Sequence, residues 1–190
     1  MDKMLENYTL QGSLLDILTY PNPVLTTKAS TVNDFDDNLK QLTHNMLYTM
    51  YHAPGIGLAG PQIGISKRIF VLDIDYDREE TSEDSGKYTL ENFNPKVFIN
   101  PVIIKTEGKI NYQEGCLSLP GIYEDVSRYE HITVEYQDTD GNPHSIDADQ
   151  LLSICIQHEN DHLDGIVFIE RLSMLKKNFL KKKLLKGQRS

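Results

Sequence analysis

The stretch ADQLLSICIQHENDH, residues 148–162, decides how this chain of 190 residues is interpreted. Its apolar residues recur at three- and four-residue intervals, which predicts an amphipathic helix. Asp147 or Asp149 can cap the start of this helix, and Gly165 is placed to end it.

This predicted helix carries the motif H-E-x-x-H. His158 and His162 are four residues apart, so both imidazoles project from the same face and can bind one metal ion. Glu159 lies about 100° further around the helix. It is therefore expected beside the metal as an acid/base group and not as a ligand.

A catalytic metal site needs a third protein ligand and an open position. Metalloproteases with a third histidine carry it six residues after the motif, but that position holds Phe168. The remaining candidate is Cys116. An alternative is a closed structural zinc site in which Cys155 adds a second sulfur to Cys116, His158 and His162, and this would indicate a binding module.

Helices and strands flank the motif without βαβ alternation. The fold class is therefore α+β, with antiparallel-rich sheets around the central helix and one domain over 1–190. A helix is predicted from Asn33 to about Met50, capped by Asn33 or Asp34 and ended at Pro54-Gly55. The other expected elements are strands at 67–74, 97–99, 102–105 and 131–137, a hairpin turn at Asp140-Gly141 leading into 143–146, an exposed loop over 75–95, and a basic C-terminal helix at about 173–187.

Composition excludes several classes of protein. Apolar residues make up 39% and charged residues 25%, which is typical of a globular chain. The longest apolar runs have four residues, and the start of the sequence lacks an apolar leader, so neither a membrane span nor a secretory signal is expected. Two cysteines are too few for a disulfide framework and favour a reducing compartment.

Three segments together form a more specific pattern. They are Gly55–Gln62 (GIGLAGPQ), Glu114–Ser118 (EGCLS) and Gln157–Leu163 (QHENDHL). In this order they resemble the peptide deformylase family, and the similarity includes YPNPVL at 20–25 and the C-terminal helix. The resemblance implies a hydrolase that removes the formyl group from the N-terminal formylmethionine of new polypeptides and releases formate.

The resemblance also implies roles for individual residues. Cys116, His158 and His162 would hold one divalent metal, Fe²⁺ in cells, although Zn²⁺, Ni²⁺ and Co²⁺ also accept these ligands. Glu159 would carry the proton, and the Gln62 side chain and the Leu117 backbone N–H would stabilise the oxyanion. Glu114 would pair with Arg128. Spacing alone suggests that Asp161 orients a ligand histidine.

A pocket for the methionine side chain follows from helical geometry. Three helix residues precede His158 on its metal-facing side, and Gly57 allows the backbone to approach a ligand closely. The predicted lining is Ile56, Gly57, Tyr112, Leu151, Ile154 and Cys155.

The charge is unevenly distributed. From Arg171 onward there are eight Lys or Arg residues and no acidic residue, while the preceding 170 residues hold 11 bases and all 28 acids. The basic helix is a candidate contact with the ribosome, as in similar enzymes, or a solvated face that offsets the acidic body. A bacterial cytoplasm or an organellar matrix is implied, with no specific DNA partner.

Overall fold

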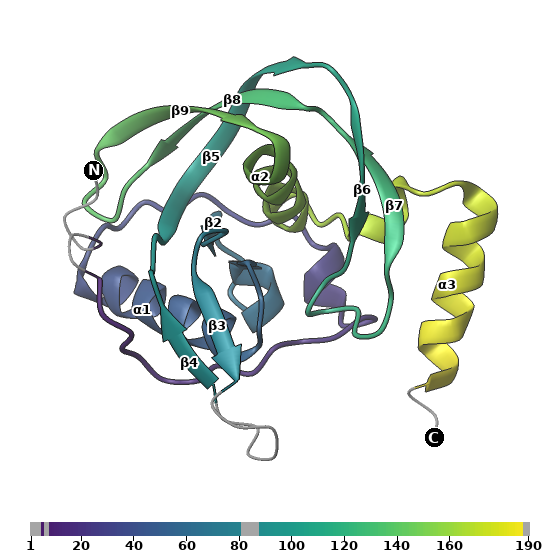
Figure 1. Cartoon of the computed structure of the whole chain (residues 1–190), viewed down its shortest axis with the longest axis horizontal. Coiled ribbons are helices and arrows are strands. Elements are labelled where there is room, and N and C mark those ends of the chain that lie inside the picture. Colours follow the sequence, from purple (N-terminus) through teal and green to yellow (C-terminus); the bar gives the residue numbers. More distant parts are fainter. Residues whose placement is uncertain (1–4, 6–7, 81–87, 188–190) are drawn as a thin grey trace.

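The computed structural model describes residues 5, 8–80 and 88–187, and its antiparallel sheets curve around helix α2 (Figure 1). The largest sheet has five strands in the order β1-β2-β5-β8-β9, and β3–β4 and β6–β7 form two further pairs. The α+β prediction is confirmed. The helices are α1 (Asp37–His52), α2 (Gln150–Leu163) and α3 (Met174–Gly187), with short 3₁₀ turns η2 (Pro23–Thr26), η3 (Gly60–Ile63) and η4 (Phe168–Arg171). The strands are β1 (Gly57–Ala59), β2 (Ile69–Leu72), β3 (Asp77–Glu80), β4 (Tyr88–Glu91), β5 (Lys96–Glu107), β6 (Ile110–Glu114), β7 (Glu124–Arg128), β8 (His131–Gln137) and β9 (Pro143–Asp149).

Strand β2 is buried on both faces because helices cover both sides of the sheet. Phe70 and Leu72 belong to the apolar cluster that includes residues of α2, whereas Ile69 and Val71 belong to the cluster formed with α1. Alternate residues of a strand point to opposite faces, so a continuous apolar run is what this position requires. The predicted strand at 67–74 is correct in place and longer than the observed one.

Helix α1 starts later than the sequence pattern predicted. The carboxylate of Asp36 accepts a hydrogen bond from the Leu39 backbone N–H at 2.9 Å, which is the N-cap interaction. Capping by Asn33 or Asp34 is therefore wrong. The helix ends just before Pro54, as expected.

The start of α2 also differs from the prediction. Asp149 occupies the N-cap position but its side chain makes no capping hydrogen bond. Asp147 instead accepts a hydrogen bond from the Thr133 hydroxyl at 2.6 Å across the β8–β9 pair. Neither aspartate caps through its side chain. Gly165, with φ at +72°, follows the helix as predicted and adopts the left-handed conformation that glycine favours.

The two strands predicted at 97–99 and 102–105 form one strand, β5. The pairing of β5 with β8 shifts register between Ile99 and Val102, around Asn100 with its positive φ of 51°. The Asn-Pro pair therefore marks a bulge within the strand and not its end.

The segment 75–95 is not a long loop, so that prediction is wrong. Asp77–Glu80 pairs with Tyr88–Glu91, and the Arg78 guanidinium lies 3.8 Å from the centre of the Tyr88 ring. These strands are mostly exposed, so they lack the apolar alternation that identifies a half-buried strand. The part of this segment at 81–87 lies outside the described residues.

The predicted hairpin at Asp140-Gly141 is confirmed. Strand β8 has the predicted bounds, and β9 extends beyond 146 to Asp149, where it leads directly into α2. The β6–β7 hairpin gave no clear signal in the sequence.

The C-terminal helix α3 is confirmed, and only some of the apolar residues in and just before it dock on the body. Leu180 is buried in a cluster with residues of η4, and Leu172 and Leu184 pack against that cluster. Leu175 and Phe179 are 83% and 67% exposed, so they do not dock on the body. Among the described residues, no helix has the length and apolar character that a membrane span requires.

Candidate active site

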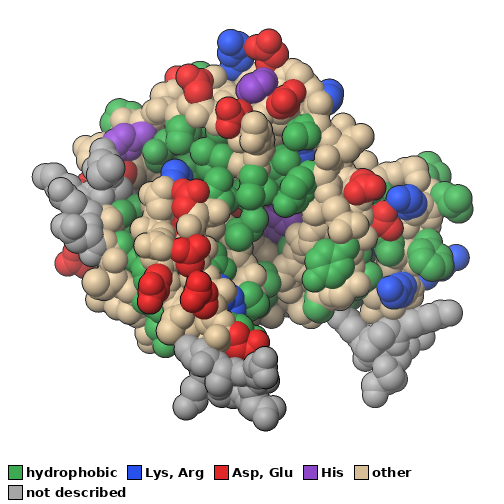
Figure 2. Space-filling model, viewed as in Figure 1, with side chains coloured by type: hydrophobic (Ala, Val, Ile, Leu, Met, Phe, Trp, Pro, Cys, Tyr) green, Lys and Arg blue, Asp and Glu red, His purple; other side chains and the backbone are tan. Residues whose placement is uncertain are grey.

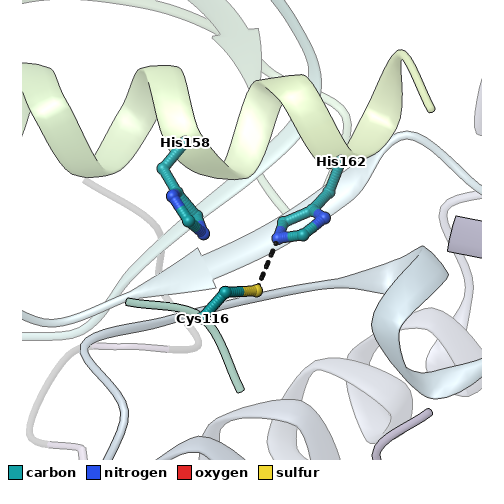
Figure 3. A group of neighbouring side chains, drawn as sticks. All are labelled: Cys116, His158 and His162. Atoms are coloured by element: carbon teal, nitrogen blue, oxygen red, sulfur yellow. Dashed lines mark hydrogen bonds between the residues drawn. The ribbon is translucent and has the colours of Figure 1, made fainter. Parts of the chain in front are cut away.

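Helix α2 and the turn after β6 bring together three potential metal ligands (Figure 3). The ligand atoms of Cys116, His158 and His162 all lie within 4.8 Å of one another. The Cys116 Sγ to His162 Nε2 distance is 3.3 Å. Within the described part of the chain, no other group of three His, Cys, Asp or Glu residues meets this criterion.

The orientation of His158 is fixed by a buried carboxylate. Its Nδ1 lies 2.8 Å from Glu114 Oε2, and Arg128 donates two hydrogen bonds to the same carboxylate at 2.6 and 2.9 Å. Burial by itself would raise the pKa of Glu114, but the hydrogen bonds from Arg128 and His158 outweigh it and lower this pKa to about 2. An ionised carboxylate only accepts hydrogen bonds, so His158 Nδ1 carries the proton and Nε2 is left as the donor atom for a metal.

Asp161 does not orient a ligand histidine directly, so that prediction is wrong. Its carboxylate accepts hydrogen bonds from Arg128 and Arg171. The buried Nδ1 of His162 has no hydrogen-bond partner within the described residues. The pairing of Glu114 with Arg128 is present as the resemblance implied.

The chemistry of these three donors fits a divalent transition metal. One sulfur and two imidazole nitrogens suit Fe²⁺, Co²⁺, Ni²⁺ or Zn²⁺. Ligand atoms around a tetrahedral ion are about 3.6 Å apart, close to the separation between Cys116 and His162. Three protein ligands leave one position for water or substrate, as catalytic sites require.

Glu159 lies next to the ligand His158 in the sequence and is buried at the edge of the same pocket. It is 5% exposed, and its Oε2 is buried without a hydrogen-bond partner in the described residues. Burial raises the pKa of Glu159 to about 7, although the nearby His158 opposes the shift. A carboxyl group with this pKa can both take up and release a proton near neutrality.

Gly57 makes room for Glu159. A Cβ atom at this position would lie 2.3 Å from Glu159 Oε1, which is too close for any side chain. The sequence predicted that Gly57 lets backbone approach a ligand. In the structure, the group that comes close to Gly57 is the carboxylate of Glu159.

Gln62 is held so that its amide nitrogen faces the cluster. Its Oε1 accepts a hydrogen bond from the Ala59 backbone N–H at 2.8 Å, which fixes the orientation of the amide. Its Nε2 then lies 3.5 Å from Cys116 Sγ and 3.3 Å from Ser118 Oγ. Leu117 is half-buried beside Cys116 and also lines the pocket.

A pocket of about 580 Å³ opens onto these residues. In Figure 2 hydrophobic side chains (green) surround a hollow near the centre of the view, and a histidine side chain (purple) is visible at its floor. Glu159, His158, Cys116 and Gln62 border this pocket. Its wall includes all six residues that the sequence predicted for the methionine side chain: Ile56, Gly57, Tyr112, Leu151, Ile154 and Cys155.

Comparison with known proteins gives the family of the chain. The family model for polypeptide deformylase matches residues 14–178. The chain belongs to the polypeptide deformylase family. A peptide deformylase from Chromobacterium violaceum is 46% identical over 177 residues, which cover 93% of this chain and 98% of the relative.

Solved deformylase structures share the fold. A deformylase structure from Legionella pneumophila has a TM-score of 0.78 and 39% sequence identity to this chain. The match covers 93% of this chain and 96% of the Legionella chain. A structure from Synechococcus elongatus, in complex with actinonin, has a TM-score of 0.76 and 43% identity. The match covers 91% of this chain and 88% of the Synechococcus chain. Membership in the deformylase family makes the chain an enzyme that removes the N-formyl group from nascent peptides.

The structural-zinc alternative is not favoured for this deformylase. Cys155 is absent from the group of potential ligands and instead lies in the pocket wall and the apolar cluster under α2. Burial raises the pKa of its thiol, which disfavours the thiolate that a metal would need.

Sequence reasoning missed part of the deformylase pocket. The segment after Cys116 supplies Leu119, Ile122 and Tyr123, and the Tyr123 side chain is 66% exposed at the rim. These residues belong to a turn with no periodic pattern. Their closeness in sequence to Cys116 was the one signal that could have identified them.

Proposed function

We propose that Cys116, His158 and His162 hold one divalent metal ion, that Glu159 is the acid/base group, and that the adjoining pocket binds the methionine side chain of a formylated peptide. The observation that carries the proposal is that Glu159 and Gln62 line the same pocket as Cys116 and His158, two of the three residues whose ligand atoms lie together. A metal ion in this donor set acts as a Lewis acid that acidifies water and polarises a carbonyl oxygen. In this proposal the whole chain forms one catalytic domain.

Glu159 moves the proton in this scheme. Its carboxylate takes a proton from the water that attacks the formyl carbon, and the same group delivers a proton to the departing amine nitrogen. The C–O bond to water forms first and gives a tetrahedral oxyanion, and the C–N bond of the formamide then breaks as the nitrogen receives the proton. The products are formate and a peptide with a free amino terminus.

The developing oxyanion needs preorganised donors. Gln62 Nε2 already faces the ligand cluster because its Oε1 is held by the Ala59 N–H. The Leu117 backbone N–H is the second donor. Fixed donors of this kind cost no reorganisation during reaction, so each stabilises the transition state more than the bound substrate.

The substrate pocket is apolar next to the metal ligands. Ile154 and Cys155 are buried in its wall, and Ile56 and Tyr112 are partly exposed at its edge. An unbranched thioether side chain fills such an irregular apolar space well. These residues, with Gly57 and Leu151, are the proposed methionine-binding set.

The native metal is proposed to be Fe²⁺, in line with the resemblance to the family, with Zn²⁺, Ni²⁺ or Co²⁺ as replacements that the donors also accept. Bacterial relatives favour a bacterial cytoplasm as the location, or an organellar matrix in a eukaryote. No membrane and no specific DNA partner is proposed.

The ribosome is proposed as a partner of α3. Lys182 and Lys183 are exposed and form no ion pair with the part of the chain that the structure describes. Lys176, by contrast, is paired with Glu124 on β7 at 2.6 Å. The free basic charge of α3 suits RNA phosphates, which the acidic remainder of the chain would repel.

The test of the proposed function is formate release from a formyl-Met peptide by protein purified without oxygen, together with its metal content. The expected result is about one metal ion per chain and hydrolysis of the formylated peptide, with no hydrolysis of the same peptide carrying an N-acetyl group. Cys116→Ala should lose both metal and activity. Full activity in metal-free protein would contradict the proposal.

A further inference from the structure

Arg171 connects the C-terminal region to the helix that carries the metal ligands. It is the last residue of η4, and its guanidinium donates two hydrogen bonds to the carboxylate of Asp161 in α2. Arg171 Nε lies 2.5 Å from Asp161 Oδ2, and Nη2 bonds Oδ1. The Arg171 side chain is 43% exposed, whereas that of Asp161 is 6% exposed.

From Asp161 a line of buried ion pairs leads to His158. Arg128 Nη1 donates to Asp161 Oδ2 at 2.6 Å, and its other nitrogens bind Glu114. Glu114 in turn holds His158 Nδ1 at 2.8 Å. The side chains of Arg128 and Glu114 are only 1% and 3% exposed, so water does not screen these contacts.

From this geometry we infer that Arg171 is a positioning residue for His158, an inference that rests on the metal site proposed above. The two-donor contact fixes the plane of the Asp161 carboxylate, which keeps Oδ2 directed at Arg128. Without Arg171, Asp161 is a buried carboxylate with one cationic partner and is free to turn. Arg128 then loses its third fixed contact, and Glu114 orients His158 less firmly.

A second contact supports the same link. Phe168, the first residue of η4, is buried and its ring stacks on His158 with centroids 6.0 Å apart and planes 30° from parallel. Asp161 itself lies in α2 between the two ligand histidines. The turn η4 therefore holds the ligand-bearing part of α2 at two points.

Helix α3 is joined to η4 by ion pairs. Glu170, next to Arg171, forms ion pairs with Lys177 at 3.3 Å and with Lys181. The contact from Arg171 thus lies between a peripheral helix and the metal ligands. Removing an α3 lysine leaves the bond between Arg171 and Asp161 in place, which provides a matched control.

The test is the affinity of the metal-free protein for Co²⁺, measured by competition with a chelator, together with the visible absorption spectrum of the Co²⁺ form. Loss of a direct partner of a metal ligand weakens metal binding by about tenfold to 100-fold. Because Arg171 acts through three intervening residues, Arg171→Met should weaken Co²⁺ binding by about threefold to tenfold and alter the spectrum. Arg171→Lys should recover part of the loss. Lys181→Met should stay within about twofold of wild type.

The outcomes separate this inference from the proposed function. If the wild-type chain binds no Co²⁺ through Cys116, the proposed metal site is wrong. If wild type binds Co²⁺ but Arg171→Met has the same affinity and spectrum, this inference alone is wrong. A lower urea midpoint for Arg171→Met with unchanged Co²⁺ affinity would likewise overturn it, because the role would then be purely structural.

Discussion

Gly57→Ala should impair catalysis by moving Glu159. The added Cβ would lie 2.3 Å from Glu159 Oε1, whereas ordinary contacts of a Cβ lie at 3.4 Å or more. The strand cannot withdraw freely, because Gly57 is paired with Leu72 in the five-stranded sheet. The carboxylate must therefore shift by about 1 Å.

The size of the effect follows from this displacement. A shift of about 1 Å in a catalytic group can lower the rate by about 100-fold, which corresponds to about 2.7 kcal/mol of transition-state stabilisation. We expect Gly57→Ala to lower kcat/KM for a formyl-Met peptide by about this factor. The metal content should stay unchanged, because the three atoms nearest the added Cβ all belong to Glu159, which is not among the proposed ligands.

Gly55→Ala is the matched control. Its Cβ would lie 2.9 Å from Leu117 Cδ1, the flexible end of a side chain that can turn away. We expect a loss in kcat/KM of no more than about threefold. The assay is initial-rate formate release at several peptide concentrations, with metal analysis of each sample. If Gly57→Ala kept activity within about twofold of wild type, catalysis would not depend on where the Glu159 carboxylate lies, and the reasoning would be refuted.

Three further predictions concern other parts of the chain. Cys155→Ser should keep its metal and much of its activity, because the thiol lies in the pocket wall; X-ray absorption that shows two sulfurs per metal would contradict this. The double variant Lys182→Glu/Lys183→Glu should hydrolyse short peptides normally but co-sediment less with ribosomes at low salt. Co-sedimentation equal to that of wild type would refute the contact. The double variant is preferred to a deletion of α3, because the deletion would also remove the buried Leu180. Tyr51→Phe removes a buried 2.6 Å hydrogen bond to Asp73 and should lower the free energy of unfolding by about 1–3 kcal/mol in urea titration; an unchanged midpoint would show that this bond contributes nothing.

Elements with a strong apolar period could be predicted from the sequence. The spacing in 148–162 identified α2 and placed His158 and His162 on one face, and the buried run at Ile69–Leu72 identified β2. The hairpin β3–β4 could not be found in this way. Its side chains are mostly exposed, so its pairing leaves no alternating apolar pattern.

The site was predictable to the extent that its residues lie in motifs. Cys116 was predicted from the need for a third ligand, and the part of the pocket wall on α2 from helical geometry. The contacts that orient the ligands were harder to predict. Glu114 meets His158 across 44 residues, and Arg171 meets Asp161 through a turn that no periodicity marks. Such long-range ion pairs depend on the folded topology and not on local spacing.

The most direct test of the central claim is to measure metal content and formate release together in Glu159→Ala. Because Glu159 is proposed to carry the proton and not to bind the metal, this variant should retain about one metal ion per chain while its turnover of a formyl-Met peptide falls to background. Cys116→Ala, measured in parallel, should lose the metal. If Glu159→Ala lost its metal as fully as Cys116→Ala, or kept substantial turnover, the assignment of Glu159 as the acid/base group beside a Cys-His-His metal site would be wrong.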